Sequence, residues 1–201
     1  MAATILAALH DGKVRRQLIR LGSDDGYARR WCTPDIAYGA LVRERAQRAA
    51  EALRGVAVRA PADLDETLTV VAILFDAGLF FEVHEALEPH WREARGDTRE
   101  ALRGVIQIAA GYHHGAHGNL RGARALLETG AARVRSRRLG NLVLEGFGAA
   151  VARSSARVDA GRPLSAPPFP HPQRSPPGQE VPGAVQRSSA LGVFVDGSHS
   201  P

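Results

Sequence analysis

Apolar residues in the middle of the chain recur with the spacing of an amphipathic helix. After Pro61, apolar side chains follow one another at i, i+4, i+7, i+8 and i+11 from Leu64 to Phe75. This spacing predicts a helix that begins near Asp63 and ends at Gly78. Asp63 and Glu66 have the spacing of a capping box, in which side chains accept hydrogen bonds from the free backbone amides of a helix start.

The same periodicity predicts four more helices downstream. They are expected over about 80–94, over 97–112 after a second capping box of Asp97 and Glu100, over 119–134 with Asn119 as N-cap, and over about 143–158 after Gly140–Asn141. No alternating run is long enough for a sheet. The sequence therefore predicts an all-α fold, a compact helical bundle with short connections.

The two ends of the chain are patterned differently from this middle part. Residues 1–60 are expected to form a weakly patterned helical extension, with short helices over 3–21, a loop over 22–34 and a helix over 35–53. Residues 61–160 form the predicted bundle domain. Residues 161–201 are rich in proline, serine and glycine and are expected to be a disordered tail, because such a segment buries too little apolar surface to offset its chain entropy. Whether 1–60 packs on the bundle is left open by the sequence.

Composition narrows the class of protein. Hydrophobic residues make up 44% of the chain and aromatic residues 5%, so aliphatic side chains must build the core. Cys32 is the only cysteine, which excludes an intramolecular disulfide and a cysteine-based zinc site. Without an apolar run of 18 residues or a leader pattern, we expect a cytoplasmic protein without a membrane partner.

The net charge of +5 comes almost entirely from arginine. A skew of this kind follows from coding bias, so it does not by itself indicate nucleic-acid binding. The basic run from Arg133 to Arg138 lies at a predicted helix end, where cations suit the helix dipole. We therefore do not expect a nucleic-acid partner, whereas a protein partner or a second copy of the chain stays open.

A polar cluster is the most informative feature of the predicted bundle. On a helix over 80–94, Phe81, His84, Glu88 and Trp91 fall at i, i+3, i+7 and i+10, a stripe that apolar residues normally occupy. Gln107 and His114 are expected to face this stripe from the next helix, whereas His113 and His117 are expected to be solvated residues at its end. The candidate pocket consists of Glu82, His84, Glu85, Glu88, Trp91, Gln107 and His114.

The residues of this region resemble a known family. GLFFEVHEALEPHW, followed by RGVIQIAAGYHHGAHGNLRGARALLE, is similar to the bacterial family of domain of unknown function 309, over about residues 64–134. The resemblance falls on Gly78, Glu82, His84, Glu85, Leu87, Glu88, Trp91, Gly104, Gln107, His114, Gly118, Asn119, Gly122 and Ala123. It implies an all-helical fold and brings no established activity.

Two interpretations of the cluster stay open. In the first, the protein is a binding or interaction module without a cofactor, and a buried network of the histidine, carboxylates, Gln107 and Trp91 fixes the helix register. In the second, it is an enzyme, in which His84, Glu85, Glu88 and His114 hold a divalent metal or perform acid–base chemistry of a hydrolase type. No nucleophile motif accompanies the cluster, and we favour the first interpretation.

Overall fold

The computed structural model describes residues 1–31, 36–159 and 164–171, and these residues form an almost entirely helical protein. The predicted fold class is confirmed. In chain order the described elements are α1 (Ala2–Ala7), α2 (Gly12–Ser23), α3 (Asp25–Trp31), α4 (Ile36–Ala52), α5 (Leu64–Asp76), α6 (Phe80–Glu93), α7 (Gly96–Ala116), α8 (Leu120–Val134), β1 (Arg138–Leu139), β2 (Leu142–Val143) and α9 (Glu145–Asp159). None of the described helices is long and apolar enough to cross a membrane.

The helix ends in the predicted bundle follow from local hydrogen bonds. The Asp63 carboxylate accepts from the backbone amide of Glu66 at 2.9 Å, so α5 has the predicted N-cap. Glu66 in turn accepts from the amide of Ala62, one residue before the position that a capping box requires. At the other end Gly78 has a φ of 71°, and the Leu79 amide donates to the Leu74 carbonyl at 2.9 Å. Glycine is needed there because a side chain at positive φ is strained.

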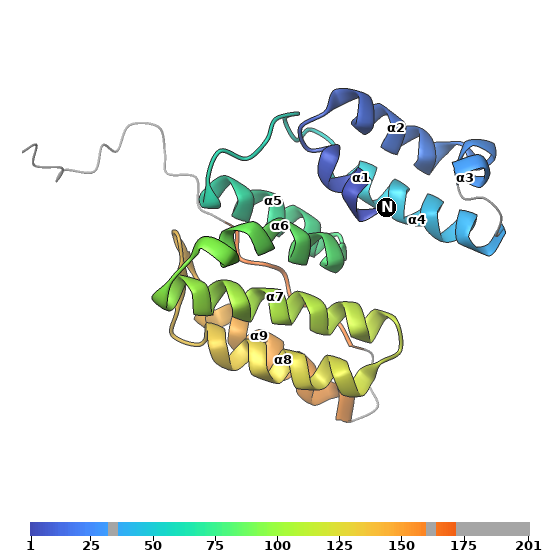
Figure 1. The fold of residues 1–201 in the computed structure, drawn as a ribbon. Coiled ribbons are helices and arrows are strands. Elements are labelled where there is room, and N and C mark those ends of the chain that lie inside the picture. The colour runs from blue at the N-terminus through green and yellow to red at the C-terminus, as the bar shows by residue number, and fades with distance from the viewer. Residues whose placement is uncertain (32–35, 160–163, 172–201) are drawn as a thin grey trace, which may run out of the picture.

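Helices α7, α8 and α9 pack side by side in one part of the molecule, and α5 and α6 lie between them and α1–α4 (Figure 1). Two glycines let α7 and α8 approach closely. A Cβ on Gly130 would lie 2.8 Å from the Gly104 carbonyl oxygen, and a Cβ on Gly104 would lie 2.7 Å from a Val134 methyl group. The contact therefore requires glycine on both helices.

The N-terminal extension packs on the bundle. Its buried residues Ile5, Leu18 and Ala46 belong to the same hydrophobic core as Leu87 of α6 and Ile108 of α7. Such a continuous core makes the extension and the bundle one folded body.

The prediction of a loop over 22–34 is wrong for residues 22–31, which the structure describes. Helix α2 continues to Ser23 and α3 follows from Asp25 to Trp31. The cause is Asp24, whose carboxylate accepts from the backbone amide of Tyr27 at 2.8 Å and so caps a short helix with few apolar residues. Residues 32–35, including Cys32, lie outside the described part.

Two sequence signals that were expected to start helices act differently in the structure. Helix α7 begins at Gly96 after Arg95, which makes no side-chain cap, and Glu100 forms an ion pair with Arg133 of α8 in place of a capping box with Asp97. Gly140–Asn141 does not lead into a helix but forms the turn between β1 and β2. Gly140 has a φ of 56°, which suits the tight turn of a hairpin and delays the start of α9 to Glu145.

The predicted disordered tail does not hold for residues 164–171, which run back along the bundle. Phe169 is 1% exposed, and its ring lies 5.3 Å from that of Phe75 and 5.0 Å from that of Phe147, between centroids. The Asp76 carboxylate accepts from the Phe169 amide at 2.8 Å and lies 2.9 Å from His171 Nε2. Prolines exclude a helix here, but they do not prevent an extended segment from burying a phenylalanine. Residues 161–163 and 172–201 are outside the described part.

Candidate functional site

The carboxylates of α6 lie in two different environments, one buried and one partly exposed. Glu82 is fully buried and points to α4, where Arg45 binds it through both oxygens: Nη2 donates to Oε2 at 2.8 Å and to Oε1 at 3.0 Å, and Nε donates to Oε1 at 3.1 Å. A buried carboxylate needs such a partner because its charge has been removed from water. Glu82 therefore ties the extension to α6 and is not available to the rest of the predicted cluster.

His84, Glu85 and Glu88 form a separate group, which we call the His–Glu group. The His84 Nδ1 atom lies 3.1 Å from Glu85 Oε1, and one ligand atom from each of the three residues lies within 4.8 Å of the others. Their side chains are 35%, 38% and 30% exposed. Nitrogen and oxygen donors at this separation are the ligands that zinc, nickel, copper or manganese ions take in proteins.

Trp91 and Gln107 do not form the hydrogen-bond network that the sequence predicts. The indole ring of Trp91 packs against the guanidinium of Arg99, 4.3 Å from its centroid. Trp91 Nε1 and Gln107 Oε1 are both buried and, among the described residues, have no hydrogen-bond partner. These two atoms therefore take no part in the predicted network of histidine, carboxylates, Gln107 and Trp91.

His114 belongs to the turn between α7 and α8. Its Nδ1 atom accepts from the Asn119 side-chain amide at 2.9 Å, and the Asn119 amide nitrogen of the backbone donates to the His114 carbonyl at 3.0 Å. Asn119 Oδ1 also accepts from the Gly122 amide at the start of α8. The imidazole therefore acts in the closure of this turn, apart from the His–Glu group.

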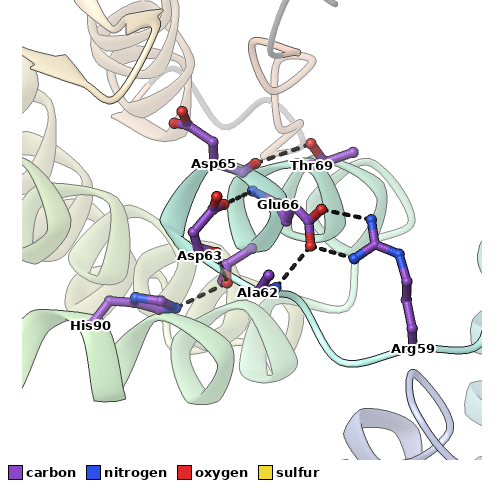
Figure 2. Close-up of polar contacts among 8 residues, drawn as sticks. Arg59, Ala62, Asp63, Asp65, Glu66, Thr69 and His90 are labelled. Carbon is purple, nitrogen blue, oxygen red and sulfur yellow. Dashed lines mark hydrogen bonds and ion pairs between the residues drawn. The ribbon is translucent and has the colours of Figure 1, made fainter.

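His90, near the C-terminal end of α6, contacts α5 and not the His–Glu group. The Nε2 atom of His90, which is labelled in Figure 2, lies 2.9 Å from the hydroxyl of Thr67, a residue 5% exposed near the start of α5. Figure 2 also shows Glu66 between the amide of Ala62 and the guanidinium of Arg59. The Arg59 side chain, with the Ala62 amide, lowers the pKa of Glu66 to about 2.

A row of rings connects the His–Glu group to the end of α7. The Phe81 ring lies 6.2 Å from that of His84 and 5.6 Å from that of His113, and the rings of His113 and His117 are 4.3 Å apart, between centroids. His113 is half-buried, and burial lowers its pKa below the ordinary value, helped by the nearby charges of His117 and Arg45. His113 is thus not the solvated helix-end residue that the sequence predicts.

Neither Arg45 nor the row of rings was predicted from the sequence. Arg45 lies three residues after Val42 and four before Ala49, both buried, so helical periodicity puts it beside the buried stripe of α4. That position is the one signal that pointed to a buried partner. Nothing in the spacing indicated which carboxylate it would bind.

Fold and site together define an all-helical protein with a histidine and two carboxylates gathered on one helix of its bundle. The family model described as Domain of unknown function (DUF309) matches residues 69–126, so the resemblance predicted from the sequence is confirmed for this part of the chain. The match contains all of α6 and α7, most of α5 and the first half of α8. Comparisons with curated proteins and with solved structures gave no match.

Proposed function

We propose that the protein is a binding module that holds a divalent transition-metal ion on α6 between His84, Glu85 and Glu88. The observation that carries this proposal is the convergence of one imidazole nitrogen and two carboxylate oxygens within 4.8 Å of one another. Ligands of a bound ion lie about 3 Å apart, since each is about 2 Å from the metal. Rotation of exposed side chains is enough to close this difference.

Partial exposure supports a binding role over a purely structural one. A structural network is buried and fully paired, as Glu82 is with Arg45. The His–Glu group is about one-third exposed and has weaker partners. Glu88 accepts from Arg92 at 2.7 Å, but Arg92 is 68% exposed, and a surface ion pair of this kind contributes less than about 1 kcal/mol. A divalent ion can displace it.

Three protein ligands leave coordination positions open. Water or a ligand of the ion would fill them, as in metal sites whose protein ligands do not complete the shell. The contact of His84 Nδ1 with Glu85 Oε1 turns the imidazole toward the carboxylates, and the ion would take the place of the proton between these two atoms. The ion would therefore meet a histidine already turned toward the carboxylates.

The alternative function is acid–base chemistry of a hydrolase type at the same residues. The observation in its favour is again the contact of His84 with Glu85, because a carboxylate beside an imidazole orients it as a proton acceptor. The two functions differ in turnover. Steady hydrolysis of p-nitrophenyl acetate that disappears in His84→Gln favours the enzyme, and metal binding without turnover favours the module.

Quenching of Trp91 fluorescence tests the metal proposal. In the full-length Trp31→Phe variant, purified without a histidine tag, Trp91 is the only tryptophan, and it lies one helical turn from Glu88. We expect Ni²⁺ to quench it with a saturable curve, and His84→Gln or Glu88→Gln to weaken binding by about tenfold or more, since loss of a ligand costs at least as much as loss of its supporting contact.

Two matched controls separate the site from general surface effects. His10→Gln removes an exposed histidine near the N-terminus. Glu128→Gln removes a carboxylate that, like Glu88, pairs with an arginine four residues away; its partner is Arg124, at 2.8 Å. Both should leave the curve unchanged. Quenching that is absent, or that is equal in His84→Gln and the parent protein, contradicts the proposal.

A further inference from the structure

A groove separates α4 of the extension from the ends of α6 and α7. Its volume is about 610 Å³, within the range of small-molecule sites. We call it the α4–α7 groove. Its lining combines large apolar side chains with cations and imidazoles; the residues used below are Tyr38, Leu41, Phe81, Arg48, His113 and His117.

The apolar part of the lining is unusually open to solvent. Tyr38 is 64% exposed, Leu41 is 62% exposed and Phe81 is 39% exposed. Single exposed apolar residues are common on protein surfaces, but three that line one hollow offer a continuous surface for an apolar ligand. Phe80, half-buried behind them, packs on Phe75 and Tyr112 and gives the groove a rigid floor.

The polar part of the lining consists mainly of hydrogen-bond donors. Arg45 and Arg48 reach it from α4, and His113 and His117 reach it from α7. Glu44, the carboxylate in the lining, pairs with Arg48 at 2.6 Å. Glu82, the partner of Arg45, is fully buried, so a ligand in the groove would lie closer to the guanidinium than to this carboxylate. Because Arg45 is already paired with Glu82, the donors that face the one exposed acid are Arg48 and the two imidazoles.

We propose that the α4–α7 groove binds a small molecule with an apolar body and a carboxylate group. The apolar body would pack on Tyr38, Leu41 and Phe81, and the carboxylate would accept hydrogen bonds from Arg48, His113 and His117. A carboxylate suits these donors because charge-assisted hydrogen bonds to guanidinium and imidazolium groups are about twice as strong as neutral ones. The site uses none of the three residues of the His–Glu group, so it stands without the metal.

The environment of His113 makes the affinity of the groove for a carboxylate depend on pH. In the free protein burial lowers the pKa of His113 below 6.5, and the charges of His117, Arg45 and His114 act in the same direction. No acid faces this imidazole among the causes of that shift. A bound carboxylate would raise the pKa of His113, so the affinity for the carboxylate should increase as the pH falls toward the lowered pKa of the free protein.

The test uses three probes of one shape that differ in charge: 4-phenylbutyrate, 4-phenylbutanol and 4-phenylbutylamine. Proton–nitrogen spectra of the histidine rings in the full-length protein report binding at His113. We expect the carboxylate to bind several times more tightly than the alcohol and the amine to bind least. Phe81→Ala should weaken all three probes, whereas Arg48→Gln should weaken the carboxylate and leave the alcohol unchanged.

Arg54→Gln is the control, because Arg54 lines a different hollow, between the extension and α5, and should not change any affinity. Circular dichroism confirms that each variant is folded. Equal affinity for the carboxylate and the alcohol, or no binding of any probe up to its solubility limit, overturns the proposal. Sedimentation that shows a dimer which Phe81→Ala dissociates would also overturn it, since the groove would then be an interface between copies.

Discussion

Helix α6 carries the same kind of side chain in two different environments. Glu82 is fully buried and held by Arg45 through both oxygens. Glu85 and Glu88 are about one-third exposed and lie beside an imidazole. A buried carboxylate that is fully paired with one partner stabilises the fold. Several half-exposed donors that converge on one point can instead bind a ligand.

The largest expected effect comes from the buried pair. Arg45→Met leaves Glu82 buried without a partner, and breaking such a pair typically costs about 3 kcal/mol or more. For a chain of this length that corresponds to a fall in melting temperature of roughly 6–12 °C. Differential scanning calorimetry measures it.

The double variant Arg45→Met with Glu82→Leu should recover most of that loss, because it removes the buried charge as well. Glu85→Gln is the comparison at a partly exposed carboxylate and should change the free energy of unfolding by less than about 0.5 kcal/mol. If Glu85→Gln destabilises the protein as much as Arg45→Met, the distinction between the buried and the exposed carboxylates of α6 is wrong.

A smaller effect on stability is expected from the ion pair of Arg59 and Glu66. This pair is exposed, whereas the carboxylate that pairs with Arg45 is buried. The pKa of Glu66 is lowered from 4.5 to about 2 in the folded protein. Its contribution to stability is therefore present above pH 4.5 and is lost as the pH falls toward 2. Melting curves of Glu66→Gln should lie below those of the parent protein at neutral pH and approach them in acid. A constant difference at every pH would contradict this assignment.

The smallest effect concerns Arg92, the exposed partner of Glu88. Arg92→Gln removes a competitor of the metal ion, and an i, i+4 pair contributes about 0.4 kcal/mol. Affinity for Ni²⁺ should therefore rise about twofold in the quenching titration. Arg124→Gln, which alters the equivalent pair on α8, should leave it unchanged. Weaker metal binding in Arg92→Gln would show that Glu88 does not act as a ligand.

Local signals in the sequence predicted the central helices well. The apolar spacing after Asp63, the glycine at 78 and the cap at Asn119 all act within a few residues, and the structure has these helix ends where they were predicted. The short helix α3 was missed because it has few apolar residues and depends on one cap at Asp24. Gly140–Asn141 is an equally good signal for a hairpin turn and for a helix start, and packing decides between them.

Contacts between distant residues could not be predicted in the same way. The periodicity placed Glu82 in one cluster with His84, whereas the structure pairs it with Arg45, 37 residues away. Phe169 lies among prolines, and only the presence of Phe75 and Phe147 on the finished bundle gives its ring a place to be buried. The grouping of His84 with Glu85 and Glu88 was accessible because all three lie within one and a half turns of a single helix.

The pair of Arg45 and Glu82 has a consequence for where this protein can be divided. The stretch recognised by the family model, 69–126, contains the acid but not its base, and it also excludes Phe147 and Phe169, which cover Phe75. A fragment cut at those limits would carry an unbalanced interior charge and an uncovered aromatic surface. A piece that folds by itself therefore needs at least Arg45 of α4 and the segment with Phe169 in addition to residues 69–126.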